Sequence, residues 1–146
     1  MTSDRRPTCL DLCCGLGGWT DGFLAAGYYV IGLDIMPQPE YRGHRFVQAD
    51  IRNVDGKDYA GVDVIVASPP CNEFSYQDLP WGRRKNLPPP DLSLVEACYR
   101  LRVETKPQYF LLENVRGAQK WIGRAPLHRG PFFFWGDVLL IPPLNG

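Results

Sequence analysis

The 146 residues include 16 basic and 16 acidic side chains, so the formal net charge is zero and the chain lacks the overall positive charge typical of nucleic-acid-binding domains. A hydrophobic content of 45% and a charged content of 22% are typical of a folded domain, and the length predicts one domain spanning 1–146. No apolar run is long enough to cross a membrane and no secretion signal opens the chain, so we expect a cytosolic protein without a membrane partner. The five cysteines include no CxxC pair, which argues against a disulfide framework and against a metal site.

The first predicted unit is a strand, a glycine-rich turn and a helix. Residues 8–12 form a short apolar strand candidate, the run Cys13-Cys-Gly-Leu-Gly-Gly18 follows at once, and residues 19–27 place apolar side chains at helical spacing. Glycines allow the backbone to turn tightly and to approach a ligand closely. The pattern is typical of the first unit of a nucleotide-binding α/β fold. The strict GxGxxG sequence is absent, which disfavours NAD and FAD.

Three further strands are predicted in the first half of the chain. They cover residues 28–33, 45–49 and 62–67, of which the first ends at Asp34 and the second at Asp50. The third is a run of β-branched and apolar residues, typical of a strand buried in a parallel sheet. Because parallel strands end at one edge of a sheet, these positions should form a continuous ligand-binding edge. Asp34 is placed to accept hydrogen bonds from ribose hydroxyls, although a solvated aspartate fits the same pattern.

A cysteine follows the buried strand 62–67 on a turn that begins with two prolines. In Ser68-Pro-Pro-Cys71 the prolines end the strand at the carboxyl edge, so the Cys71 thiol should lie at the mouth of a pocket. Taken alone, an ordinary buried cysteine is an equally good interpretation. Residues 72–90 lack helix or strand periodicity, which predicts a loop that either closes over a ligand or stays solvated. This loop carries three candidate phosphate contacts, Arg83, Arg84 and Lys85.

The second half of the chain predicts one long helix and three more strands. The helix is capped by Asp91, and a buried strand over 109–112 ends at Glu113. Residues 131–135 and 138–141 are predicted to be late strands. A basic segment without acidic residues lies between the buried strand and the late strands, and it forms a second candidate phosphate surface. Its cations are Arg116, Lys120, Arg124 and Arg129.

These segments together resemble the cytosine-5 DNA methyltransferase family, most like its compact bacteriophage-type members. Asp11-Leu-Cys-Cys-Gly-Leu-Gly-Gly18 is similar to the family's first motif, and Pro70-Cys71 to its nucleophile motif. Asp34 and Asp50 match the acidic positions for ribose and adenine, and Glu113-Asn-Val115 matches the motif that holds cytosine. The resemblance implies S-adenosyl-L-methionine as cofactor, DNA as partner and a place in restriction-modification. It also implies an α/β, Rossmann-like class I methyltransferase fold, with a mostly parallel sheet and helices on both faces.

The resemblance also implies how the chain is divided and which residues form the site. A cofactor half over about 8–67 would precede a catalytic loop over about 68–90 and a target-base half over about 91–146. Catalysis is assigned to Cys71, Glu113 and Asn114. Cofactor binding is assigned to Asp11, Leu12, Cys13, Cys14, Gly15, Gly17, Gly18, Trp19, Asp34, Ile35, Asp50, Ile51, Ser68 and Pro70. DNA binding is assigned to Arg83, Arg84, Lys85, Arg124 and Arg129.

A cysteine at position 71 suits chemistry at a ring carbon. A thiolate that adds to C6 of cytosine raises the electron density at C5, while Glu113 would hold N3 and the exocyclic amine. The target base would first be swung out of the duplex. Methyltransferases that alkylate an exocyclic nitrogen carry an aromatic residue at this motif position, to stack the base. Cys71 therefore favours C5 over N4 or N6 as the methylated atom.

Three departures from the family pattern leave other functions open. Cys13 stands where the family has a phenylalanine, the arginine-rich motif has no clean match, and neither a target-recognition domain nor the family's last motif is present. A second chain could supply target recognition, as in a split enzyme. The alternatives are an RNA cytosine-5 methyltransferase and a non-catalytic module that binds S-adenosyl-L-methionine or DNA. No residue pattern reports the 2′-hydroxyl that distinguishes RNA.

Overall fold

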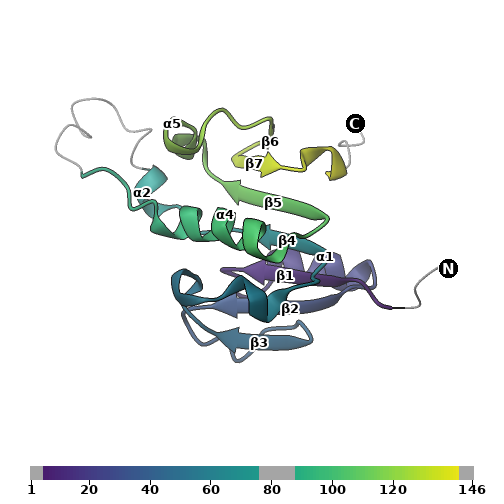
Figure 1. The fold of residues 1–146 in the computed structure, drawn as a ribbon. Coiled ribbons are helices and arrows are strands. Elements are labelled where there is room, and N and C mark those ends of the chain that lie inside the picture. Colours follow the sequence, from purple (N-terminus) through teal and green to yellow (C-terminus); the bar gives the residue numbers. More distant parts are fainter. Residues whose placement is uncertain (1–4, 76–87, 142–146) are drawn as a thin grey trace.

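The computed structural model describes residues 5–75 and 88–141. Within these residues a single seven-stranded sheet runs in the order β3-β2-β1-β4-β5-β7-β6 (Figure 1). Its strands are β1 (Thr8–Leu12), β2 (Tyr29–Asp34), β3 (Arg45–Gln48), β4 (Val64–Ala67), β5 (Tyr109–Asn114), β6 (Leu127–Arg129) and β7 (Phe132–Gly136). The first five strands are parallel, whereas β7 pairs antiparallel with β5, and β6 pairs antiparallel with β7.

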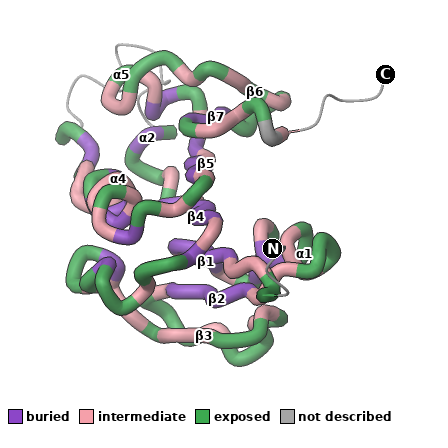
Figure 2. Tube along the Cα trace, turned by 45° about the vertical axis from the view of Figure 1, so that its right-hand side comes forward, coloured by how far each residue is buried: buried purple, intermediate pink, exposed green. Residues whose placement is uncertain are grey.

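Two helices cover opposite faces of this sheet, α1 (Gly18–Ala25) on one and α4 (Ser93–Thr105) on the other (Figure 2). The shorter helical elements are α2 (Asn72–Ser75), α5 (Gln119–Ile122) and the 3-10 turns Ile51–Asn53, Gly56–Tyr59, Arg116–Ala118 and Val138–Leu140. The predicted α/β fold, a mostly parallel sheet with helices on both faces, is confirmed. In the part of the chain that the structure describes, no helix combines the length and apolar character needed to cross a membrane.

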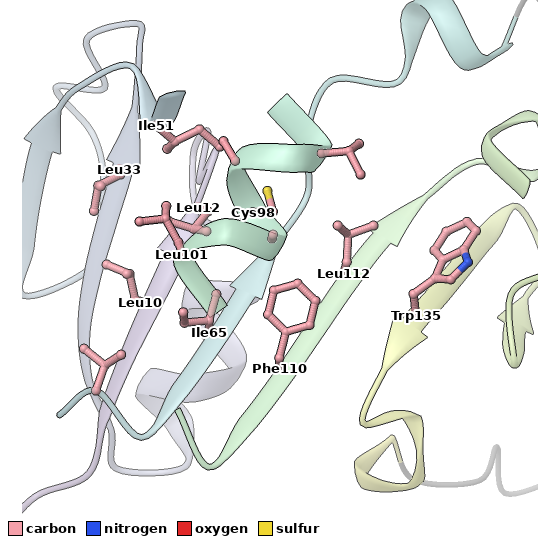
Figure 3. Close-up of a cluster of buried hydrophobic side chains, with 14 of the residues drawn as sticks. Leu10, Leu12, Leu33, Ile51, Ile65, Cys98, Leu101, Phe110, Leu112 and Trp135 are labelled. Atoms are coloured by element: carbon pink, nitrogen blue, oxygen red, sulfur yellow. The ribbon is translucent and has the colours of Figure 1, made fainter. Parts of the chain in front are cut away.

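Alternate residues of the central strands form two hydrophobic layers, because successive side chains of a strand point to opposite faces. Toward α4, leucines and isoleucines of β1, β2 and β4 pack with Phe110 and Leu112 of β5 and with Cys98 and Leu101 of the helix (Figure 3). Toward α1, the layer consists of Cys9, Val30, Val64, Val66 and Leu111, with Trp19 and Phe23 of the helix packed on it. Both layers hold the strand ends rigidly in place.

The strand order places a crevice at the carboxyl ends of β1 and β4. From β1 the chain extends the sheet in one direction through β2 and β3, and later in the other direction through β4 and β5. Ligands of open α/β sheets bind outside the carboxyl ends of the strands at such a reversal. The turns that follow β1, β2, β4 and β5 therefore define the candidate site.

The strands predicted at 8–12, 28–33, 45–49, 62–67, 109–112 and 131–135 are confirmed, with ends that differ by no more than about two residues. The helix predicted after Asp91 is also confirmed. It begins at Ser93 with Leu92 as N-cap residue, and the Asp91 carboxylate accepts a hydrogen bond from the Ser93 N–H at 2.8 Å.

One expectation about local structure is wrong, one strand was not predicted, and one further expectation is wrong at its first four residues. Residues 138–141 do not form a strand, because Gly136 ends β7 with a φ of 98° and the chain then folds into the 3-10 turn Val138–Leu140. The basic segment contains β6, which a tight turn pairs with β7 as a hairpin and which sequence periodicity did not reveal. The predicted loop 72–90 begins with the one-turn helix α2, and its residues 76–87 lie outside the described residues.

Candidate active site

The glycine turn leaves β1 through three residues with positive φ, Cys13 (56°), Gly15 (52°) and Gly17 (108°). Two of them are glycines, which adopt this conformation without a steric cost from Cβ. The turn is attached to β2, because the Gly15 N–H donates to Asp34 Oδ2 at 2.9 Å. Asp34 Oδ1 accepts from the Met36 N–H at 2.9 Å, so this carboxylate shapes the backbone while it retains lone pairs for a ligand.

A buried hydrogen-bonded cluster lies beneath this turn. Asp11 is 1% exposed, and its Oδ2 accepts a hydrogen bond from Thr20 Oγ1 at 2.8 Å. The same hydroxyl lies 2.8 Å from the Tyr41 hydroxyl. The Tyr41 ring fills the space beside Gly32, where an added Cβ would come within 2.4 Å of it. The cluster therefore joins β1, α1 and the loop between β2 and β3.

The buried carboxyl of Asp11 predicts a pH-dependent stability. Its Oδ1 has no hydrogen-bond partner, and burial raises its pKa to about 7. Between about pH 4 and pH 7 the folded state therefore keeps a proton that the unfolded state has lost, so the stability that this proton provides is complete below pH 4 and declines as the pH rises. We expect the free energy of unfolding to fall by up to about 4 kcal/mol across this range. Urea unfolding of Asp11→Asn should lack this decline, and parallel pH profiles for the two proteins would contradict the prediction.

A cavity of about 160 Å³ lies at the carboxyl ends of β2 and β3. Its wall consists of Cys13, Asp34, Ile35, Ala49, Asp50, Ile51, Arg52, Ser68, Pro70 and Leu94. Arg52 pairs with Asp50, with Nη2 at 2.7 Å from Oδ2 and Nε at 2.9 Å from Oδ1, and this guanidinium holds the pKa of the Asp50 carboxyl below its usual value. The wall combines two carboxylates with apolar side chains, as a nucleoside requires.

A larger cavity of about 470 Å³ has a wall formed by Cys13, Cys14, Gly18, Trp19, Ser68, Glu113, Phe132 and Phe134. Cys13 and Ser68 also belong to the smaller cavity, so the two cavities are neighbours. Burial raises the pKa of the Cys13 and Cys14 thiols to about 12, and both therefore stay protonated at neutral pH. Burial also raises the pKa of Glu113, while a hydrogen bond from the Ser68 side chain opposes this rise.

The turn that carries Cys71 is fastened to β5 by Asn114. This asparagine is 1% exposed, its Nδ2 donates to the Pro69 carbonyl at 3.0 Å, and its Oδ1 accepts from the Val115 N–H at 2.9 Å. Since β5 also carries Glu113, the link fixes the turn of Cys71 relative to that carboxylate. Asn114 is therefore buried between the two elements that it joins.

The half-buried Cys71 directly precedes the helix α2, and its carbonyl accepts a hydrogen bond from the Ser75 N–H at 2.9 Å. The helix packs against the 3-10 turn Arg116–Ala118, which follows β5. The Glu73 carboxylate accepts a hydrogen bond from the Asp91 N–H at 3.0 Å. These contacts hold α2, and with it Cys71, at the same sheet edge as Glu113.

The residues predicted from the sequence fall into distinct positions. Those on the cavity walls are Cys13, Cys14, Gly18, Trp19, Asp34, Ile35, Asp50, Ile51, Ser68, Pro70 and Glu113. Those in the framework of the turns, away from the two walls, are Asp11, Leu12, Gly15, Gly17 and Asn114. Cys71 belongs to neither wall, but it directly follows Pro70 of the smaller cavity. Arg83, Arg84 and Lys85 lie outside the described residues.

Several residues of the site were not predicted from the sequence. Arg52 follows Asp50 by two positions, a spacing that could have indicated their ion pair. Phe132 and Phe134 alternate along β7 and so share one face, which a period-2 pattern could have revealed. Tyr41 gave no such signal, because its partners Thr20 and Gly32 are distant in the sequence.

A cleft of about 820 Å³ lies beyond β5, and its wall includes Arg116, Arg124, His128 and Phe133. The His128 ring stacks on Phe133 with the ring centroids 4.9 Å apart. Of the two predicted DNA contacts in this region, Arg124 lies on the wall and Arg129 lies at the end of β6. Across 5–75 and 88–141, no group of three or more His, Cys, Asp or Glu side chains could hold a metal ion.

Known proteins resemble this chain over most of its length. Type II methyltransferase M.NgoMIV of Neisseria gonorrhoeae is 30% identical over 120 residues, which are 75% of this chain and 36% of the relative. Type II methyltransferase M.XorII of Xanthomonas oryzae is 32% identical over 128 residues, 77% of this chain and 29% of the relative. The chain therefore spans about a third of the length of these relatives. The solved S. pombe Dnmt2 methyltransferase shares the fold, with a TM-score of 0.56 and 20% identity over 82% of this chain and 37% of that one.

The family model of the C-5 cytosine-specific DNA methylases matches residues 7–121. This span runs from the start of β1 through the glycine turn, the Cys71 turn and β5 to α5. It thus contains both cavity walls except for the two phenylalanines of β7. The chain belongs to the C-5 cytosine-specific DNA methylase family.

Proposed function

We propose that this chain methylates C5 of cytosine in DNA, with S-adenosyl-L-methionine as the methyl donor. In this proposal Cys71 is the nucleophile and Glu113 holds the target base. The observation that supports it most strongly is the hydrogen bond from Asn114 to the Pro69 carbonyl, which couples the turn before Cys71 to the strand end that carries Glu113. Two groups that must act on one base are thereby held on one rigid edge.

The chemistry of the two cavities fits the proposed cofactor. Asp34 and Asp50 offer carboxylate acceptors to the ribose hydroxyls and the adenine amine, and Ile35 and Leu94 offer apolar contacts to the ring. The larger cavity, across Cys13 and Ser68, would receive the methionine end. When bound, S-adenosyl-L-methionine supplies an electrophilic methyl group.

The residues of the chain supply the remaining chemistry. The Cys71 sulfur forms a bond to C6 of cytosine, and the displaced electron pair moves toward C5 and N3. Glu113 hydrogen-bonds to N3 and stabilises the charge that develops there, and its raised pKa favours a proton on the carboxyl for this purpose. Once C5 is methylated, a base removes the C5 proton, and the electron pair released breaks the bond between sulfur and C6.

DNA is the proposed substrate because the family is described as DNA methylases and both curated relatives above are type II methyltransferases. The basic cleft with Arg116 and Arg124 is the described surface best suited to phosphates. The matched region is only about a third of the length of these relatives, so about two thirds of each relative lies outside it. We therefore propose that a partner chain or a further segment contributes target recognition.

A methyl-transfer assay on two substrates tests this function. The protein is incubated with tritiated S-adenosyl-L-methionine and either duplex DNA or tRNA, and the nucleosides are then identified by mass spectrometry. We expect 5-methylcytosine in the DNA. Label in tRNA alone would replace the proposal with RNA methylation, and cofactor binding with transfer to neither substrate would favour a binding module.

A further inference from the structure

A stripe of polar side chains runs along one face of α4. Ser93, Arg100 and Glu104 share this face, because the helix repeats every 3.6 residues or so. A polar stripe on an amphipathic helix usually faces water. Here the three side chains instead hydrogen-bond to the two 3-10 turns that follow β3, Ile51–Asn53 and Gly56–Tyr59. The stripe is therefore a contact surface for these turns.

Arg100 binds the backbone carbonyls of the first turn. Its Nη2 donates to the Ile51 carbonyl at 3.0 Å and to the Arg52 carbonyl at 3.4 Å. Carbonyls at the end of a short helical turn need donors from outside the turn. Within the turn, the Ile51 carbonyl accepts from the Val54 N–H at 3.3 Å, which is a long hydrogen bond. Arg100 therefore supplies this carbonyl with a second, shorter hydrogen bond.

Glu104 joins the Arg100 guanidinium to the second turn. Its carboxylate oxygens accept from Arg100 Nη1 at 2.7 and 2.9 Å, and one of them also accepts from the Gly56 N–H at 2.9 Å. The helix and this turn are in close contact, because a Cβ added at Gly56 would lie 2.4 Å from Glu104 Cβ. Glu104 thus orients Arg100 and fixes the helix against the backbone that follows the first turn.

The first turn forms one side of the smaller cavity. Asp50 is its N-cap residue, and Asp50, Ile51 and Arg52 all lie on the cavity wall. The Asp50 carboxylate accepts from the Arg52 N–H at 3.0 Å and pairs with the Arg52 guanidinium, so it is attached to the turn. The Ile51 side chain packs in the buried layer beside α4 (Figure 3). The place of the Asp50 carboxylate in the cavity is therefore set from α4.

We propose that Arg100 is a positioning residue for the adenosine end of the cofactor cavity, and that it acts through the turn that carries Asp50 and Ile51. Arg100 lies behind the cavity wall as the described residues form it, so it influences a ligand without touching it. The inference rests on the proposed function for the identity of that ligand, but the effect of Arg100 on the turn can be measured without any ligand. Loss of the guanidinium leaves the Ile51 carbonyl with the long hydrogen bond alone, and the Asp50 carboxylate becomes less well fixed.

The first test is amide hydrogen exchange of the ligand-free protein, followed by NMR. The Asn53 N–H bonds to the Asp50 carbonyl and the Gly56 N–H to Glu104, so both amides report on the turns. Arg100→Ala should speed their exchange about fivefold, as expected for the loss of one net hydrogen bond. Arg102→Ala is the matched control.

This control removes the same charge from the same helix, but the Arg102 guanidinium lies over the Phe110 ring, 4.9 Å from its centroid, and not on the turns. Its effect on the two amides should be small. Unchanged exchange in Arg100→Ala, or an equal acceleration in Arg102→Ala, would overturn the inference. The Arg100 side chain is 38% exposed, so the variant is expected to fold.

The second test is the Kd for S-adenosyl-L-methionine, measured by calorimetry. Arg100→Ala should raise this Kd about fivefold, while kcat at saturating cofactor stays within about twofold of the parent value. Arg100→Lys keeps the charge with fewer donors and should give an intermediate Kd. In an Asp50→Ala background, Arg100→Ala should raise the Kd by less than about twofold, because the carboxylate that it positions is gone.

Two results in this test would contradict the proposal. One is a Kd that stays within about twofold of the parent value in folded Arg100→Ala, and the other is an equal rise with and without the Asp50 carboxylate. A parent protein that binds no S-adenosyl-L-methionine would refute the proposed cofactor instead. The amide exchange would then still decide whether Arg100 holds the turn.

Discussion

Replacing Cys71 with alanine is expected to abolish methyl transfer, by a factor on the order of 10⁴ or more, because a covalent step loses its only nucleophile. The sharpest measurement is a covalent trap. Duplex DNA that contains 5-fluorocytosine is incubated with the protein and S-adenosyl-L-methionine. In 5-fluorocytosine, fluorine takes the place of the C5 proton that a base would remove. The final elimination is therefore blocked, and a competent enzyme stays attached to its DNA. The parent protein should form this adduct and Cys71→Ala should not.

The other cysteines provide the control. Cys9, Cys14 and Cys98 are buried, and Cys13 lies on the cavity wall with a pKa that burial raises to about 12. Cys13→Ser should therefore still form the adduct when S-adenosyl-L-methionine is saturating. An adduct that persists in Cys71→Ala, or one that disappears in Cys13→Ser alone, would assign the nucleophile to a different thiol.

Replacing Gly136 with alanine is expected to lower the free energy of unfolding by about 3 kcal/mol or more. Its φ is 98°, and an added Cβ would lie 2.3 Å from the backbone carbonyl oxygen of Phe110. That oxygen accepts a hydrogen bond from the Asp137 N–H at 2.8 Å, and the Asp137 side chain accepts from the Phe110 N–H at 2.7 Å. The clash therefore falls on a backbone segment that two hydrogen bonds hold in place, so it has little freedom to move.

Gly123→Ala is the matched control for this change. Gly123 has a φ of 108°, but an added Cβ would meet nothing within 4 Å. It should lose only about 1–3 kcal/mol, the cost of a positive-φ backbone conformation that residues with a Cβ rarely adopt. Urea unfolding of both variants isolates the clash as the difference between them. Equal losses would show that β7 can move away from β5 and relieve the clash.

The parallel half of the fold could be predicted from the sequence because its signals are local. The runs at 8–12 and 62–67 are short, apolar and β-branched, and glycines or prolines end them at once. The hairpin of β6 and β7 could not be predicted in full, since Leu127–Arg129 has only three residues and no period to detect. Gly136 ended the last strand through a close approach to β5 that exists only in the folded chain.

The positions of the site residues could be predicted from the sequence, but the hydrogen bonds between them could not. The positions of Cys71, Asp34 and Glu113 follow from the strand ends and from the family resemblance. The hydrogen-bond partner of the Ser68 side chain does not, because Trp19 lies 49 positions away along the chain. Such contacts depend on the strand order, which brings β4 between β1 and β5.

The strands at the two margins of the sheet also limit how copies of the protein can associate. Backbone groups along an unpaired sheet margin can recruit a strand from another molecule, and this is a common route to aggregation. In the described part of the chain, the marginal strands are β3, four residues long with Arg45 at its start, and β6, three residues long with Arg129 at its end. Margins this short offer few consecutive pairing sites to a strand of another molecule, so the sheet resists growth from one molecule into the next.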